Sequence, residues 1–191
     1  VALAEIVSKP DLRTGREAAE YASEIRRIMR YLGVSDGNMQ EGSLRCDVNI
    51  SVRRGPDAPF GTKVEIKNMN SFSAIQKACE YEIKRQIKAY ETGEPIVQET
   101  RLWDEGKQLT KSMRSKEGAS DYRYFPDPDL GPIEVSADQR ESWRAELPEL
   151  PAAKRARYET DLGLTASEAR LLASERSTAA YFEAALAAGA A

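Results

Sequence analysis

Apolar residues recur at a helical spacing between residues 14 and 33 of the chain. Thr14 and Glu17 have the spacing of a capping box, in which a hydroxyl and a carboxylate satisfy free backbone N–H groups at a helix start. Gly33 readily adopts the left-handed conformation that ends a helix. The pattern therefore predicts a helix beginning at Thr14, with a buried stripe made of Ala18, Tyr21, Ala22, Ile25, Ile28, Met29 and Leu32.

Two later stretches alternate strictly between apolar and polar residues. Leu44–Arg53 and Lys63–Lys67 each place apolar side chains on one face and polar side chains on the other. The turn-rich segment 54–61 connects them, so we expect the two strands to pair as a hairpin. Cys46 falls on the apolar face and is expected to be a small core residue, as is Cys79 on the following helix.

That second long helix is predicted to begin at Asn70 or Ser71 and to close at Gly93. Its expected inward-facing residues are Phe72, Ile75, Cys79, Ile83 and either Ile87 or Tyr90. Shorter helices are expected in the last third of the chain, near residues 137–146, 152–161, 165–173 and 177–188. Thr165 and Glu168 form a second capping box among them.

Further strands are expected at residues 1–8, 96–103, 108–113 and 133–135. A hairpin turn at 104–107 joins the two middle ones. Elements in this order predict an α+β fold, with a mostly antiparallel sheet and long helices followed by a small all-helical domain. We expect the first domain to occupy residues 1–135 and the helical domain to occupy residues 136–191.

Composition restricts the chemistry open to the chain. With 191 residues, 41% of them hydrophobic and 31% charged, it can form a folded core, and it has no apolar run long enough for a membrane span. The absence of His excludes a Ser-His-Asp triad, a His general base and a His-ligated metal built from these residues. Two cysteines without a CxxC pair indicate neither a zinc cage nor a secreted disulfide scaffold, so we expect a reducing, cytoplasmic location.

The opening run VALAEIV has no initiator Met, basic region or cleavage signature, so we expect a piece of a longer protein rather than a signal peptide. The net charge of −3 combines +3 over residues 1–90 (15 basic, 12 acidic) with −6 over residues 91–191 (13 basic, 19 acidic). Neither value indicates a surface that follows a phosphate backbone, so binding of a polyanion would depend on geometry.

The candidate chemistry lies on the polar face of the predicted hairpin. Because side chains alternate with a period of two, one face carries Arg45, Asp47, Asn49, Lys63, Glu65 and Lys67. Carboxylates hold Mg²⁺ and basic side chains neutralise phosphate, so this face suits a Mg²⁺–nucleotide site. The alternative is a solvated face of weak ion pairs. Glu41 and Asn68 flank this polar face. Glu5 lies in an otherwise apolar run, so it either is paired or bound to a metal, or it faces solvent.

Four long runs of residues carry a resemblance to a known family: Leu3–Asp11 (LAEIVSKPD), Glu41–Ser51 (EGSLRCDVNIS), Gly61–Phe72 (GTKVEIKNMNSF) and Lys116–Leu130 (KEGASDYRYFPDPDL). They resemble the B subunits of bacterial glutamyl/aspartyl-tRNA amidotransferase, the GatB family. The motifs occur in the family's order and with similar spacing, and the resemblance extends over almost the whole chain.

The resemblance implies an ATP-dependent enzyme that acts on misacylated tRNA. It implies that the B subunit phosphorylates the side-chain carboxylate of Glu-tRNA(Gln) or Asp-tRNA(Asn), and that ammonia then displaces the phosphate to form the amide. An amidase A subunit supplies the ammonia from glutamine, and a small C subunit supports the pair. ATP and Mg²⁺ are the implied cofactors.

The resemblance also implies roles for single residues. Glu5 corresponds to a Mg²⁺ ligand, and Asp47 and Glu65 correspond to residues of the kinase and transamidase pocket. Surrounding motif positions are matched by Lys63, Lys67, Arg45 and Glu41. We therefore expect Glu5, Asp47 and Glu65 to converge on one cleft. Family segments that hold further metal-binding residues, zinc-binding cysteines and a tRNA-gripping tail are absent from this sequence, so the isolated chain is expected to be inactive.

Two alternative hypotheses stay open: a non-catalytic module that docks a subunit or tRNA, and the archaeal E subunit, which acts only on Glu-tRNA(Gln).

The aromatic loop 121–129 is expected either to pack its rings into the body or to contact tRNA. The segment after Ser136 has seven basic and nine acidic residues, so we expect it to place tRNA by shape. Its basic residues cluster at Lys154, Arg155 and Arg157.

Overall fold

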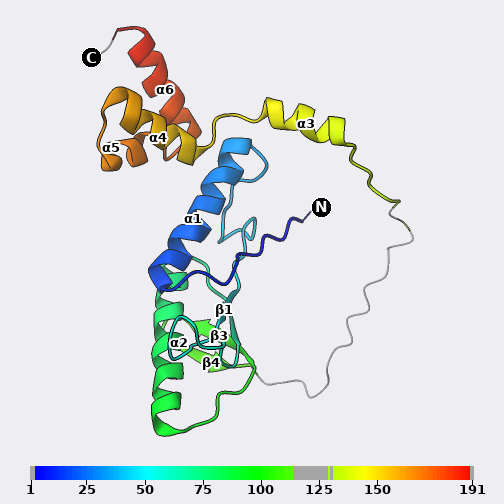
Figure 1. Cartoon of the computed structure of the whole chain (residues 1–191), viewed down its shortest axis with the longest axis vertical. Helices are drawn as coiled ribbons and strands as arrows, with labels where there is room; N and C mark the ends of the chain where they lie inside the picture. Colours follow the sequence, from blue (N-terminus) through cyan, green and yellow to red (C-terminus); the bar gives the residue numbers. More distant parts are fainter. Residues whose placement is uncertain (1–2, 114–128, 130, 190–191) are drawn as a thin grey trace. The chain divides into compact units, whose positions relative to one another are not determined.

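The computed structural model describes residues 3–113, 129 and 131–189. The chain divides into two compact units: residues 1–26 with 36–115, and residues 27–35 with 116–191. The first unit contains a sheet, and the described part of the second contains helices and loops (Figure 1). The predicted α+β class is confirmed, whereas the domain boundary placed after residue 135 stays a prediction. No helix in the described ranges is both long and apolar enough to cross a membrane.

A mixed four-stranded sheet forms the centre of the first unit. In spatial order its strands are β1 (Val48–Ile50), β2 (Val64–Lys67), β3 (Thr100–Asp104) and β4 (Leu109–Ser112). The predicted hairpins β1–β2 and β3–β4 are antiparallel, and β2 and β3 are parallel. A parallel pair needs a crossover connection, which here includes a helix. The strands are shorter than the alternation predicts, and β1 has three residues.

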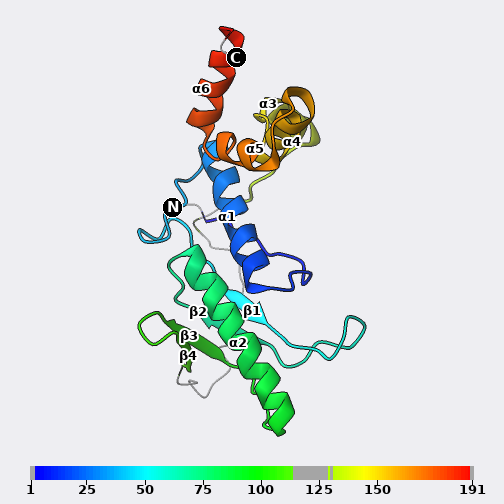
Figure 2. The same ribbon diagram turned by 90° about the vertical axis from the view of Figure 1, so that its left-hand side faces the viewer.

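Helix α2 (Phe72–Thr92) makes this crossover and lies across one face of the sheet (Figures 1 and 2). Ser71 Oγ accepts a hydrogen bond from the Ala74 N–H at 3.0 Å, and Gly93 ends the helix with a φ of 73°. The start and the end of this helix are therefore as predicted. Between α2 and the sheet lies an apolar core that includes Ile50, Ile66, Ala74, Ile75, Ala78, Cys79 and Trp103.

Helix α1 (Gly15–Leu32) begins with the predicted capping box. The Glu17 N–H donates to Thr14 Oγ1 at 3.1 Å, and the Thr14 N–H donates to Glu17 Oε2 at 3.2 Å. The helix ends at Gly33, whose φ is 69°. Residues of α1 up to Arg26 belong to the first unit, and its last turn belongs to the second.

Two predicted strands do not form in the described residues. Residues 3–9 and 133–135 have no regular structure, and Leu3 and Ile133 are 94% and 91% exposed. No described strand pairs with either segment, so their backbone groups lack the hydrogen-bond ladder that makes a strand. The strand prediction for residues 1–8 is therefore wrong where the structure describes it, as is the prediction for 133–135.

The helices of the second unit follow the prediction: α3 (Ala137–Glu146), α4 (Pro151–Leu162), α5 (Ala166–Leu172) and α6 (Arg176–Ala187). Thr165 and Glu168 form the expected capping box at the start of α5. Tyr158 of α4 is fully buried, and its ring meets the Phe182 ring edge-on at a centroid distance of 5.2 Å. Apart from Asp129, the aromatic loop 121–129 lies outside the described residues.

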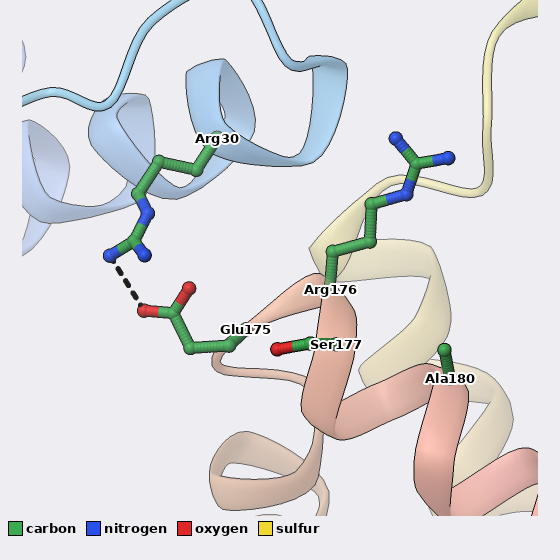
Figure 3. A pocket seen from close by; sticks show the side chains of 5 residues that line it. All are labelled: Arg30, Glu175, Arg176, Ser177 and Ala180. Carbon is green, nitrogen blue, oxygen red and sulfur yellow. Dashed lines mark hydrogen bonds and ion pairs between the residues drawn. The ribbon is translucent and has the colours of Figure 1, made fainter.

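The last turn of α1 packs within this second unit. Tyr31 is 1% exposed, and its hydroxyl donates to the Ala173 carbonyl oxygen at 2.9 Å. Arg176 donates to the Tyr31 carbonyl oxygen at 3.1 Å. Figure 3 shows the ion pair between Arg30 and Glu175, which are 2.8 Å apart. Arg30, Glu175 and Arg176 border a hollow of about 450 Å³. The sequence patterns did not indicate that residues 27–35 belong with the C-terminal helices.

Candidate functional site

On the polar face of the β1–β2 hairpin, the carboxylates of Asp47 and Glu65 both lie close to the ammonium group of Lys67. The backbone register pairs Asn49 with Glu65, so that Asp47 and Lys67 are opposite each other two positions further along. Asp47 Oδ2 lies 3.1 Å from Lys67 Nζ, and Glu65 Oε1 lies 3.5 Å from the same nitrogen. The prediction that these side chains share one face is confirmed. We name Asp47, Glu65 and Lys67 the hairpin cluster.

Lys67 of the hairpin cluster is held in its charged form, and all three side chains of the cluster are accessible. The hydrogen bond to Asp47 raises the pKa of Lys67; burial opposes this shift, and the charges of Asp47 and Glu65 reinforce it. Lys67 therefore remains a cation at physiological pH. The second carboxylate oxygen of Glu65 accepts a hydrogen bond from Thr100 Oγ1 of β3 at 2.8 Å. The three side chains of the cluster are 31–47% exposed, so a ligand can reach them.

The remaining candidate residues lie around this cluster. Arg45 and Lys63 are exposed on the hairpin, and Glu41 is exposed in the preceding loop. In that loop the Glu41 N–H donates to Asn38 Oδ1 at 3.4 Å. A Cβ at Gly42 would lie 3.8 Å from Arg45 Nη2, so the Arg45 guanidinium lies against the same loop. The hairpin thus offers carboxylate oxygens for a hard cation and basic groups for phosphate oxygens.

Glu5 is not grouped with Asp47 and Glu65 by the structure. It lies in the exposed segment before α1. In the ranges that the structure describes, no three Asp, Glu or Cys side chains form a group able to hold a metal ion. The structure therefore brings together two of the three carboxylates expected to converge, and the role of Glu5 as a metal ligand stays a prediction.

A second group of charged side chains, which the sequence patterns did not indicate, lies inside the first unit. Glu82 of α2 is fully buried. Its carboxylate accepts hydrogen bonds from Arg85 at 2.6 and 2.9 Å, from Gln86 at 2.9 Å and from Thr110 at 3.2 Å. Arg101 of β3 lies 3.7 Å from the same carboxylate. A buried charge is costly unless it is paired in this way.

The predicted burial of Ile87 or Tyr90 on α2 is wrong, since each is 41% exposed. The buried positions in this half of the helix are Glu82, Gln86 and Ala89. They continue the three- and four-residue spacing of the apolar half, so the periodicity contained the signal. The polar pair is buried because its side chains find hydrogen-bond partners in and beside the sheet.

Ile87 and Tyr90 instead line a groove of about 740 Å³ beside the β1–β2 connection. In that connection the Arg53 guanidinium lies over the Phe60 ring, 4.8 Å from its centroid. Tyr90 can approach the connection because residue 61 is Gly, where a Cβ would collide with the Tyr90 hydroxyl oxygen. The apolar side chains at the end of α2 therefore contact a loop rather than the core.

The basic cluster predicted in the helical unit is largely engaged in ion pairs. Lys154 Nζ lies 2.7 Å from Glu183 Oε1 and 3.2 Å from Glu149 Oε2. Arg157 Nη2 lies 2.6 Å from Glu149 Oε2 and also pairs with Glu183. The charges of Lys154 and Arg157 are therefore balanced by acidic side chains within the unit.

Comparison with known proteins identifies the family. Residues 1–141, which include the whole hairpin and α2, match the model of the GatB/GatE catalytic domain. The chain belongs to this family. It is 91% identical over 190 residues to the B subunit of the aspartyl/glutamyl-tRNA(Asn/Gln) amidotransferase of Synechococcus sp. (strain CC9605). The identity to the proteins of the same name is 90% for Parasynechococcus marenigrum (strain WH8102) and 84% for Prochlorococcus marinus (strain MIT 9303).

Each of these alignments covers 100% of this GatB/GatE chain, but the chain spans only 38–39% of the length of the relatives. The family resemblance inferred from the four sequence motifs is confirmed. The hairpin cluster and the buried Glu82 group both lie within the matched residues.

Proposed function

We propose that this GatB/GatE chain is part of the catalytic region of an amidotransferase B subunit. In this proposal the whole enzyme is an ATP-dependent ligase. It phosphorylates the side-chain carboxylate of Glu-tRNA(Gln) or Asp-tRNA(Asn) and amidates it with ammonia from glutamine. The match of residues 1–141 to the catalytic-domain family carries the proposal. The relatives named above are B subunits, which favours this type over the archaeal E type.

The hairpin cluster fits Mg²⁺ and nucleotide phosphate by the chemistry of its donors. Asp47 and Glu65 offer carboxylate oxygens, and Mg²⁺ usually needs only one or two protein carboxylates because it keeps several waters. Lys67, with Arg45 and Lys63 beside it, offers positive charge to phosphate oxygens. When bound, ATP and Mg²⁺ supply the activated phosphoryl group that converts a poor acylating agent, the carboxylate, into a reactive one.

The contacts of the cluster hold its charged groups in place before any ligand arrives. Lys67 lies between the carboxylates of Asp47 and Glu65, and Thr100 orients the second oxygen of Glu65. Groups positioned in advance need little rearrangement when charge develops on a substrate. Glu5, as a further Mg²⁺ ligand, and Glu41 complete the proposed site.

The proposal extends to the remainder of the enzyme. Residues 1–135 are assigned to the catalytic cradle, and residues 136–191 to the start of the helical domain. The partners are the amidase A subunit, the small C subunit and the misacylated tRNA, and the compartment is the cytoplasm.

The test is substitution of the cluster in the full-length protein, assembled with its A and C subunits. Asp47→Ala and Glu65→Ala should each reduce amidation and tRNA-dependent ATP hydrolysis by at least about a hundredfold, because both remove a charged group from the reacting centre. Glutamine hydrolysis by the amidase should persist. Glu80→Ala is the matched control, since Glu80 is exposed on α2 and accepts a hydrogen bond from Gln76. Wild-type amidation by either cluster variant would reject the assignment.

A further inference from the structure

The side chain of Gln86 on α2 is bonded to the backbone where β1 ends. Its Nε2 donates to the Ile50 carbonyl oxygen at 3.3 Å, and its Oε1 accepts from the Val52 N–H at 3.1 Å. One residue of a parallel neighbouring strand would make the same two bonds, on either side of Ser51. Gln86 is fully buried. Its amide therefore continues the hydrogen bonding of the β1 backbone at the point where the β1–β2 pairing ends.

The orientation of this amide is set by Glu82. Gln86 Nε2 also donates to Glu82 Oε1 at 2.9 Å. An ionised carboxylate only accepts hydrogen bonds, so the nitrogen of the amide must face Glu82 and its oxygen is left to face Val52. Glu82 is held in turn by Arg85 and by Thr110 of β4, the strand at the opposite edge. One buried carboxylate thus links the two outermost strands of the sheet.

β1 depends on such support because it is short. It has three residues, and three pairs join it to β2. Asp47 directly precedes β1, and its carboxylate lies 3.1 Å from Lys67 of β2. A displacement of β1 along or away from β2 would therefore change the separation of Asp47 from Lys67 and Glu65.

We propose that Gln86 is a positioning residue for the hairpin cluster: by bonding the backbone at the end of β1 it fixes Asp47 relative to Lys67 and Glu65. Glu82 acts one step earlier, by fixing the Gln86 amide. Gln86 itself is buried and acts only through β1. The effect on catalysis rests on the proposed amidotransferase function, whereas the effect on the geometry of β1 does not.

The first experiment is Gln86→Leu in the full-length protein within the assembled enzyme. Amide hydrogen exchange at residues 50–52 should accelerate at least about tenfold, because the Val52 N–H loses its acceptor, while exchange in β4 stays as in the wild type. The kcat of amidation should fall about ten- to a hundredfold with an unchanged KM for aminoacyl-tRNA, as expected for a misplaced reacting group. Gln76→Leu is the matched control on the same helix, where the amide donates to Glu80.

A second variant separates positioning from folding. Exchanging the pair, Glu82→Gln with Gln86→Glu, keeps one carboxylate and one amide in contact and keeps an acceptor for Val52. This double variant should recover kcat relative to Gln86→Glu alone, even if Gln86→Leu does not fold.

Three results would overturn the proposal: unchanged exchange at Val52, wild-type kcat despite faster exchange there, or no recovery in the double variant. A merely structural role would instead accelerate exchange throughout the first unit and lower kcat only in proportion to the unfolded fraction. If Asp47→Ala leaves amidation intact, the proposed function fails, and exchange at Val52 still decides whether Gln86 holds β1.

Discussion

At the scale of single residues, two neighbouring side chains in the segment leading into β1 have opposite environments. Asp47 faces outward and binds Lys67, whereas Cys46 faces the core. Burial, followed by the nearby charge of Asp47, raises the pKa of the Cys46 thiol to about 11. Burial also raises the pKa of Cys79 on α2 to about 12. Both thiols are therefore protonated core side chains, as their sequence positions predicted.

Both cysteines should react slowly with thiol reagents in the folded chain. A rise of the pKa of Cys46 from 9.0 to about 11 lowers its thiolate fraction at neutral pH about a hundredfold, and the thiolate is the nucleophile. Rates of alkylation by iodoacetamide at neutral pH, in the folded chain and in urea, measure this directly. The variants Cys46→Ser and Cys79→Ser assign the rate to one thiol at a time. A native Cys46 that reacts at the unfolded rate would contradict the expectation.

At the scale of elements, one carboxylate joins two helices of the second unit. Glu183 of α6 accepts hydrogen bonds from Lys154 at 2.7 Å and from the Tyr158 hydroxyl at 3.1 Å, both on α4. Arg157 of α4 bonds Glu183 and also forms a two-bond pair with Glu149. The hydrogen bonds from Arg157 lower the pKa of Glu149 to about 2, against a smaller opposing effect of burial. These basic groups therefore stabilise the contact of α4 with α6.

The stability of α4 should depend on pH through Glu149. Its pKa is lowered on folding from 4.5 to about 2, so its contribution is fully present above the unfolded value and is lost as the pH falls from about 5 towards 2. Glu149→Gln should be less stable at neutral pH and should lose less stability on acidification. Hydrogen exchange of α4 amides across this pH range gives the measurement. Glu141→Gln, which removes an exposed ion pair with Arg144 on α3, should leave the profile unchanged.

At the scale of the whole molecule, the features that could be predicted from the sequence are those that local physical chemistry determines. The capping boxes at Thr14 and Thr165 use residues three positions apart, and the β1–β2 face follows from alternation alone. The strand expected at 1–8 failed because a strand exists only with a partner, which apolar residues cannot specify. The spacing of α2 also placed Gln86 on the buried face, but its hydrogen-bond partners at the end of β1 are distant in sequence and could not be predicted from it.

The charge distribution of the whole chain predicts weak binding to tRNA. The net charge is −3, and Lys154 and Arg157 are paired with acidic side chains rather than open to phosphate. Each phosphate contact contributes about 0.9 to the slope of log affinity against log salt, so we expect a slope below about 2 for the 191-residue chain. Filter binding of tRNA between about 50 and 200 mM KCl gives the slope. Lys154→Gln should leave it unchanged, because Lys154 is not a phosphate contact. Tight binding at physiological salt, or a shallower slope in Lys154→Gln, would mean that these ion pairs open to hold the RNA backbone.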